Sequence, residues 1–404
     1  MFFNRRVPFF IRESYYYDSR AAVLWGIFWG TSLAFFPVIA RKIGATSLQM
    51  ALLTAAPFVG SLFTLYWSRL SGRMCKMRFF ILVKMIARVS IFLMFFAVDP
   101  WFFIVVVFLN ALFELAGSPA YAGIMKEIYP DSFRGRAMGY VRSEQAISAV
   151  FASYIGGILL DRISYRYIFP LATIAGILSL LYFGRIKIKD ENRKVENIKK
   201  QKLGLFPFEA IDIFKKDRLF SLYCLIFFAY GFGSLIAMPL YPIFLVDVFH
   251  ASNTFIGKLG SLSSFFWIIS YIFWGRFVDR RGEINSFTFS FMLSSLIPLL
   301  YSVSFNIWFI VLASIISGFN IGTEVIRINY ITKITKPENV QTYQGIDFSL
   351  MGLRGITAPF IGVKLMNLIG IRETLFVSFS IIFVAFFLMC WFNFRYLRKK
   401  KICQ

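Results

Sequence analysis

The sequence predicts an all-α integral membrane protein with twelve transmembrane helices. Three observations support this prediction: the composition, the length of the apolar runs and the placement of the basic residues. The 404 residues are 58% hydrophobic and 19% aromatic, and 51 of them are phenylalanine. A water-soluble chain of this length could not bury so much apolar surface, so a lipid bilayer must be the solvent for much of it.

The apolar runs are long enough to cross a bilayer, which takes roughly 20 residues in a helix. The twelve predicted spans cover residues 21–41, 48–70, 78–98, 101–125, 137–161, 166–184, 219–248, 254–277, 284–304, 307–332, 341–367 and 373–396.

The net charge of +23 would also suit a nucleic-acid-binding protein, but the basic residues cluster at the ends of apolar runs rather than along one soluble face. We therefore expect no nucleic-acid partner. The basic residues gather in alternate connections and at both termini, which predicts a multi-pass protein of the cell membrane with both termini in the cytoplasm. The opposite loops hold four exceptions: Arg41, Lys42, Arg162 and Arg166.

The longest connection, residues 185–218, divides the spans six and six. It predicts an N-terminal bundle over 1–184 and a C-terminal bundle over 219–404. The connection begins with mixed charges that leave nothing to bury. It then changes to "LGLFPFEAIDIFKKDRLF", where apolar and basic residues alternate. This second part predicts an amphipathic helix on the inner membrane face, with a plain solvated linker as the alternative.

The two halves repeat each other at a constant offset of 207 positions. Trp67, Arg69 and Arg73 match Trp274, Arg276 and Arg280, and Trp101 matches Trp308 at the start of the tenth span. Such a register indicates two pseudo-symmetric six-helix bundles that arose by duplication, and parallel repeats of this kind occur in transporters.

A short motif lies after the eighth span. The stretch "GRFVDRRG", from Gly275 to Gly282, resembles the G-x-x-x-D-R-x-G signature of the major facilitator superfamily. That signature lies in cytoplasmic loops between helices 2 and 3 and between helices 8 and 9. The resemblance implies the fold of that superfamily, transport by alternating access, and a central cavity lined by helices 1, 4, 7 and 10.

The signature residues are predicted to hold the cytoplasmic side closed. Asp279 would lie against the exposed amides at the start of the fifth helix, while Arg276 and Arg280 would pair with acids or helix C-termini. Gly275 and Gly282 would permit a tight turn. The alternative is a basic loop that only sets the topology.

The first copy of the signature is altered. Gly72 stands where the carboxylate is expected, while Arg69 and Arg73 are kept. The residues assigned to the gating loops are therefore Gly275, Arg276, Asp279, Arg280, Gly282, Arg69 and Arg73.

Ionisable residues inside spans are costly in a bilayer and usually functional. Glu114 lies in the fourth span, and Arg88 in the third span is expected at a similar depth, so a Glu114–Arg88 pair is expected. The residues predicted to bind substrate or protons are Glu114, Glu324, Arg327, Arg354 and Arg88. Two interpretations of these residues remain open. A carboxylate among them takes up and releases a proton, or the charges form fixed pairs that hold helices together. Arg354 could face an anionic substrate or bond to backbone carbonyls of the opposite bundle.

The fifth span contains part of a second pattern. Proton-driven antiporters of this superfamily often carry G-P-x-x-G-G in helix 5, and here the matching residues are Ala152, Ser153, Gly156 and Gly157. Close helix packing on small residues is the favoured interpretation. The pattern gives only a slight preference for export.

These observations predict a secondary active transporter with no ATP site, because the sequence has no G-x-x-x-x-G-K-[ST] motif. The expected substrate is a small amphipathic compound exported in exchange for protons. The alternatives are uptake or exchange of a small organic anion and, in another class, a non-transporting receptor or assembly partner. We expect a monomer with no enzymatic activity and no cofactor. The four cysteines lack paired short spacing, so no disulfide framework or zinc site is expected.

Overall fold

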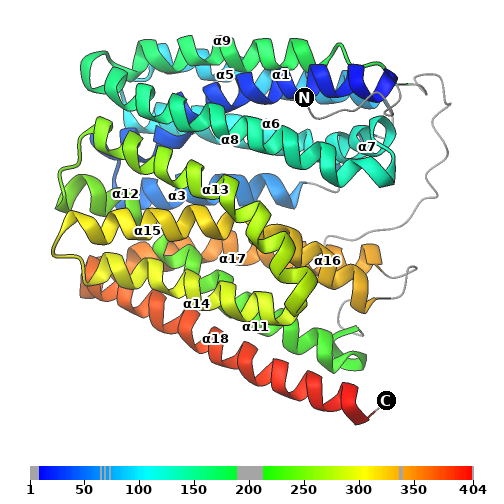
Figure 1. The fold of residues 1–404 in the computed structure, drawn as a ribbon. Helices are drawn as coiled ribbons and strands as arrows, with labels where there is room; N and C mark the ends of the chain where they lie inside the picture. The colour runs from blue at the N-terminus through cyan, green and yellow to red at the C-terminus, as the bar shows by residue number, and fades with distance from the viewer. Residues whose placement is uncertain are drawn as a thin grey trace. The chain divides into compact units, whose positions relative to one another are not determined.

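The computed structural model describes residues 9–63, 66–67, 70–71, 74–188, 213–335 and 340–402. Some side chains within these ranges are outside the description, including that of Glu324. The described residues form helices and the turns between them, without a β-strand (Figure 1). The predicted all-α class is confirmed.

The helices of the first half are α1 (Phe9–Thr31), α2 (Phe36–Lys42), α3 (Ser47–Leu62), α5 (Lys76–Phe92), α6 (Pro100–Ala116), α7 (Ser118–Ile128), α8 (Asp131–Arg162) and α9 (Tyr165–Phe183). Those of the second half are α11 (Arg218–Ala237), α12 (Leu240–Ile243), α13 (Asn253–Arg281), α14 (Glu283–Ser302), α15 (Ile307–Asn320), α16 (Glu324–Ile334), α17 (Val340–Ile369) and α18 (Ile371–Ile402). Among the described residues, 10 stretches are long and apolar enough to cross a membrane. The second and tenth predicted spans correspond to two shorter apolar helices, Ser47–Leu62 and Ile307–Thr323.

The internal repeat is visible in the helix boundaries. A shift of 207 positions carries the start of α5 at Lys76 onto the start of α14 at Glu283, and α6 onto α15 in the same way. Both α6 and α15 begin with a tryptophan in the second position, Trp101 and Trp308, and both tryptophans are exposed. A side chain two residues earlier accepts a hydrogen bond from each tryptophan amide and caps the helix.

The chain divides into two compact units. Unit 1 is residues 1–201 with 249–265, and unit 2 is residues 202–248 with 266–404. In unit 1, α1 packs on α8 and α9, and α5 packs on α6 and α9. In unit 2, α11 packs on α17 and α18, and α14 packs on α15 and α18. Repeat-related helices therefore make the same kinds of contact within each unit. The boundaries predicted for the bundles and the linker stay a prediction, and residues 189–212 of that linker lie outside the described ones.

Several helices begin or break where the apolar pattern alone did not predict it. α1 begins at Phe9 rather than near residue 21, because the polar stretch before the apolar run continues the same helix. The fourth span divides at Gly117 into α6 and α7, with proline at the start of α7, where its missing N–H costs no hydrogen bond. The seventh span is interrupted after Ala237, just before Pro239, because proline cannot continue the hydrogen-bond pattern of a helix interior.

The signature after the eighth span is mostly helical rather than a loop. α13 continues through Arg281, so Gly275 lies inside a helix and a Cβ there would meet no atom within 4 Å. The expected turn role of Gly275 is therefore wrong. Gly282 does make the turn, since its φ of +78° is a conformation that side chains with a Cβ rarely adopt.

The small residues of α8 permit a close helix contact, as predicted. A Cβ at Gly157 would lie 2.4 Å from the carbonyl oxygen of Asn253, and one at Gly257 would lie 2.4 Å from that of Ser153. At the end of this contact, the Asp161 carboxylate accepts hydrogen bonds from the amides of Asn253 at 2.8 Å and Thr254 at 2.7 Å. The first turn of α13 is thereby capped by a residue of α8.

Replacing Gly157 with alanine is expected to destabilise the protein. The added methyl group meets backbone atoms that have no flexible end to move away, so we expect a loss of about 1–3 kcal/mol in the free energy of unfolding. Thermal unfolding of the purified protein in detergent measures the change.

Gly139→Ala is the matched control on the same helix. Its Cβ would meet nothing within 4 Å, and alanine favours a helix over glycine. Equal unfolding temperatures for the two variants would contradict the close contact at Gly157.

Candidate functional site

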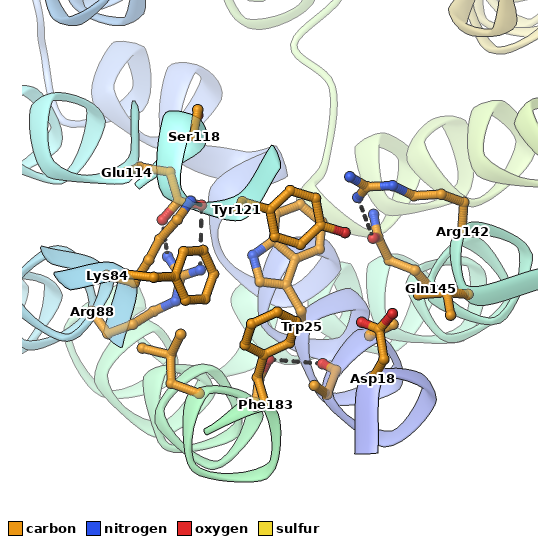
Figure 2. Close-up of a pocket in the computed structure, with 16 residues that line it drawn as sticks. Asp18, Trp25, Lys84, Arg88, Glu114, Ser118, Tyr121, Arg142, Gln145 and Phe183 are labelled. Atoms are coloured by element: carbon orange, nitrogen blue, oxygen red, sulfur yellow. Dashed lines mark hydrogen bonds and ion pairs between the residues drawn. The ribbon is translucent and has the colours of Figure 1, made fainter. Parts of the chain in front are cut away.

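Unit 1 contains a cavity of about 250 Å³. The residues that line it come from α1, α5, α6, α7, α8 and α9. Figure 2 shows charged side chains at two opposite ends of this cavity, with aromatic rings between them. The volume is close to the lower limit for small-molecule pockets, roughly 300 Å³.

One end of the cavity is formed by three ionised side chains, which we call the ion group: Glu114 of α6 with Lys84 and Arg88 of α5. Lys84 Nζ lies 2.6 Å from Glu114 Oε1, and Arg88 Nη1 lies 2.5 Å from Glu114 Oε2. Arg88 Nη2 is a further 3.4 Å from Oε1. Both carboxylate oxygens are therefore engaged, and two positive charges compensate one negative charge.

The ion group is held in a largely apolar setting. The Arg88 side chain is only 1% exposed, and its guanidinium lies 4.6 Å from the centroid of the Phe28 ring. Gly176 of α9 leaves room for it, since a Cβ there would lie 2.9 Å from Arg88 Cδ. Charges buried in this way are stable only when they are paired and hydrogen-bonded. Glu114 is therefore required to keep Lys84 and Arg88 in place.

The middle of the cavity is aromatic. Trp25 and Tyr121 lie between its two ends (Figure 2), and Phe80 and Phe183 also line it. The Phe183 ring packs against Phe80 at a centroid distance of 4.9 Å and against Tyr121 at 5.9 Å. Such rings favour flat, apolar ligand surfaces.

The other end contains Asp18 of α1 with Arg142 and Gln145 of α8. Asp18 is 3% exposed, and the hydroxyl of Tyr129 donates a 2.9 Å hydrogen bond to its Oδ2. Arg142 Nη1 donates to Gln145 Oε1 at 2.8 Å, and its guanidinium lies 5.9 Å from the Tyr121 ring centroid. Burial raises the pKa of the Tyr129 phenol, so this hydroxyl keeps its proton and acts as a donor.

The structure brings together some of the residues predicted from the sequence. The Glu114–Arg88 pair is confirmed, and Lys84 joins it. Arg327 and Arg354 do not line this cavity. They lie in unit 2, where Arg327 Nε is 3.4 Å from Asp347 Oδ2.

Arg354 contacts backbone, which was one of its two expected environments. Its Nη1 donates to the carbonyl oxygen of Phe227 in α11, and its guanidinium lies against Gly231. This carbonyl belongs to the same unit, so the expected contact with the opposite bundle is wrong. Arg354 is 7% exposed.

The remaining predicted residues are either outside the described part of the chain or exposed on α13. Arg69 and Arg73 lie outside the described residues, as does the side chain of Glu324. Arg276, Asp279 and Arg280 are exposed on the last turns of α13. Their role in closing one side of the protein stays a prediction.

The end of the cavity around Asp18 was not predicted from the sequence. Asp18 precedes the first predicted span and lies in the polar first turns of α1, and Tyr129 lies in a connection between predicted spans. Arg142 and Gln145 lie five and eight residues after the start of the predicted span 137–161, in a stretch rich in polar residues.

The ion group gives a prediction for stability. Arg88→Gln and Glu114→Gln, made singly and together, are expected to show a coupling energy of about 1–3 kcal/mol, because Glu114→Gln leaves two buried cations without a counter-charge and Arg88→Gln removes one of the two partners of Glu114. Denaturant unfolding of the purified protein measures all four combinations.

The exposed pair of Lys333 and Glu283, at 2.9 Å, is the control. Lys333 is 66% exposed, so solvent screens this pair and its coupling should stay below about 1 kcal/mol. Coupling energies of equal size for the two pairs would show that the ion group does not hold α5 and α6 together.

Comparison with known proteins places the chain in a family. The pattern described as the Major Facilitator Superfamily matches residues 21–235 and 223–402. The chain is 26% identical over 183 residues to the multidrug resistance protein MdtG of Salmonella arizonae, and 25% identical to that of Salmonella choleraesuis. Each match covers 43% of this chain and 45% of the relative.

Solved transporter structures share the fold. The nucleoside transporter NupG superimposes with a TM-score of 0.70 at 13% identity, covering 96% of this chain and 99% of NupG. The human organic anion transporter MFSD10 (TETRAN) gives 0.66 at 14% identity, covering 95% of this chain and all of the other. The twelve-helix fold is therefore shared, and the chain belongs to the major facilitator superfamily of membrane transporters.

Proposed function

We propose that this protein is a secondary active transporter that moves a small amphipathic compound across the cell membrane by alternating access. The observation that carries the proposal is the cavity of unit 1, where aromatic side chains lie between two charged ends. A compound with a flat apolar body and a polar group would be complementary to such a cavity.

Export driven by protons is the proposed direction and coupling. The partial match to MdtG, a multidrug resistance protein, supports export of amphipathic compounds. Two carboxylates line the cavity, Asp18 and Glu114, and a carboxylate reached from one side at a time is the usual way to couple transport to protons. The basic residues at both ends of the chain support termini in the cytoplasm.

A second candidate function is uptake or exchange of a small organic anion. Three basic side chains, Lys84, Arg88 and Arg142, line the cavity against two acidic ones, so its formal charge is positive. This surplus favours a negatively charged ligand. Arg327 and Arg354 give less support, because the described contacts already engage both.

Replacing Trp25 with alanine tests the cavity as the binding site. Loss of the ring's contact area is expected to raise the apparent KM of the transported compound about tenfold, which corresponds to roughly 1.4 kcal/mol of binding. Uptake into inside-out vesicles measures it, with a panel of cationic, neutral and anionic aromatic compounds.

Trp308→Ala serves as the matched control, since Trp308 is 69% exposed and does not line the cavity. An unchanged KM in Trp25→Ala would place binding elsewhere. Preference for anionic compounds would favour the second candidate. A folded protein that transports no compound of the panel would favour a receptor or assembly role, which the altered first signature at Gly72 also supports.

A further inference from the structure

We propose that Asp18 is the carboxylate that takes up and releases the coupled proton, whereas Glu114 stays ionised as the counter-ion of Lys84 and Arg88. This assignment rests on the proposed proton-coupled transport and names the residue that carries it out. In this assignment the Asp18 end of the cavity exchanges the proton, and the Glu114 end holds a fixed ion pair.

Glu114 is poorly suited to exchange a proton. Both of its oxygens accept charged donors, Lys84 Nζ at 2.6 Å and Arg88 Nη1 at 2.5 Å. A proton on Glu114 would leave these two cations without a counter-charge in a setting where Arg88 is only 1% exposed. Unpaired buried charges are among the most costly arrangements in a protein. The ion group therefore opposes protonation.

Asp18 is in the opposite situation. Within the described part of the chain, the neutral hydroxyl of Tyr129 is its only hydrogen-bond partner, and no basic nitrogen lies within ion-pair distance. The residue is 3% exposed, yet it lines the cavity (Figure 2). A buried carboxylate with one neutral partner gains from binding a proton, and the cavity gives that proton a route.

The groups that face Asp18 balance one another. Arg142 and Glu144 of α8 lie within electrostatic reach of its carboxylate, as do the phenols of Tyr15 and Tyr121. Arg142 favours the charged form, whereas Glu144 disfavours it. A small movement of α8 relative to α1 would change this balance and with it the proton affinity of Asp18.

Glu144 adds an independent indication that protons are exchanged here. The Tyr15 hydroxyl donates to its Oε1 at 2.6 Å, while Oε2 is buried without a hydrogen-bond partner. Two carboxylates, each held by a tyrosine hydroxyl, therefore lie within electrostatic reach of each other. Two like charges at one site favour protonation of one of them, and Asp18 is the one that lines the cavity.

The proton step is a simple acid–base exchange. The Asp18 carboxylate takes a proton from water on one side of the membrane and forms an O–H bond. When the carboxyl group becomes accessible from the other side, its O–H bond breaks, the proton passes to water there and the carboxylate is restored. No oxidant, cofactor or covalent intermediate takes part.

Infrared titration of the full chain in lipid nanodiscs tests the assignment without a known substrate, since the proton itself is the ligand. The wild-type protein should show a protonated-carboxyl band that titrates with pH. Asp18→Asn should lose this band, and Glu114→Gln and Glu144→Gln should keep it. Asp99→Asn is the matched control, because Asp99 is an exposed helix cap and asparagine caps equally well.

Tyr129→Phe provides a second readout that a merely structural role would not give. Removing the hydroxyl takes a hydrogen bond away from the ionised carboxylate, so the titration midpoint should move to higher pH by about one unit. Loss of the band in Glu114→Gln or Glu144→Gln but not in Asp18→Asn would overturn the assignment, as would an unchanged midpoint in Tyr129→Phe.

Transport in proteoliposomes separates this assignment from the proposed function. The panel compound that the wild-type protein moves is followed with and without an imposed pH gradient. The ratio of gradient-driven accumulation to gradient-independent exchange should fall at least tenfold in Asp18→Asn, whereas Asp99→Asn should keep the wild-type ratio. A gradient response in Asp18→Asn equal to the wild type would refute only the assignment. A wild-type protein that ignores the gradient would refute the coupling itself.

Discussion

The pairing of Glu114 with Lys84 and Arg88 is the interaction on which the cavity depends. It places three charges inside a unit whose outer surface is apolar, and it joins α5 to α6 at the level of the cavity. Removing Glu114 leaves two cations that neither lipid nor the neighbouring phenylalanines can compensate.

The two halves repeat the helix positions but not the buried charged residues. Shifting by 207 positions carries the first-half helices onto those of the second half, yet Glu114 then falls on Ile321, and Lys84 and Arg88 fall on Phe291 and Ser295. Unit 2 instead places Arg327 beside Asp347 and Arg354 against a backbone carbonyl. The shared helix packing was kept after duplication, while each half acquired its own buried charges.

Much of the fold was predictable from the sequence because the bilayer requires long apolar helices and simple alternation of basic loops. The Glu114–Arg88 pair was predictable for a related reason. An unpaired charge in hydrocarbon is costly, so two opposite charges at the same depth on neighbouring helices are expected to form an ion pair. Asp18 was not predictable, because it lies in polar turns that look like a terminal segment until α9 and α8 are seen to cover them. The helical signature at Gly275 was missed because glycine and arginine in succession usually mark a turn, and here only Gly282 makes one.

Trp101 and Trp308 have a consequence for the depth of the charges. Both are exposed at equivalent helix starts, and tryptophan settles where hydrocarbon meets headgroups. They thus fix the depth in the bilayer of the helices they begin, α6 and α15. At about 1.5 Å per residue, Glu114 lies roughly 20 Å beyond Trp101 along its helix, in a hydrocarbon layer about 30 Å thick. A thinner membrane would bring the ion group closer to the opposite headgroups, so lipid thickness becomes a control on how much water reaches it.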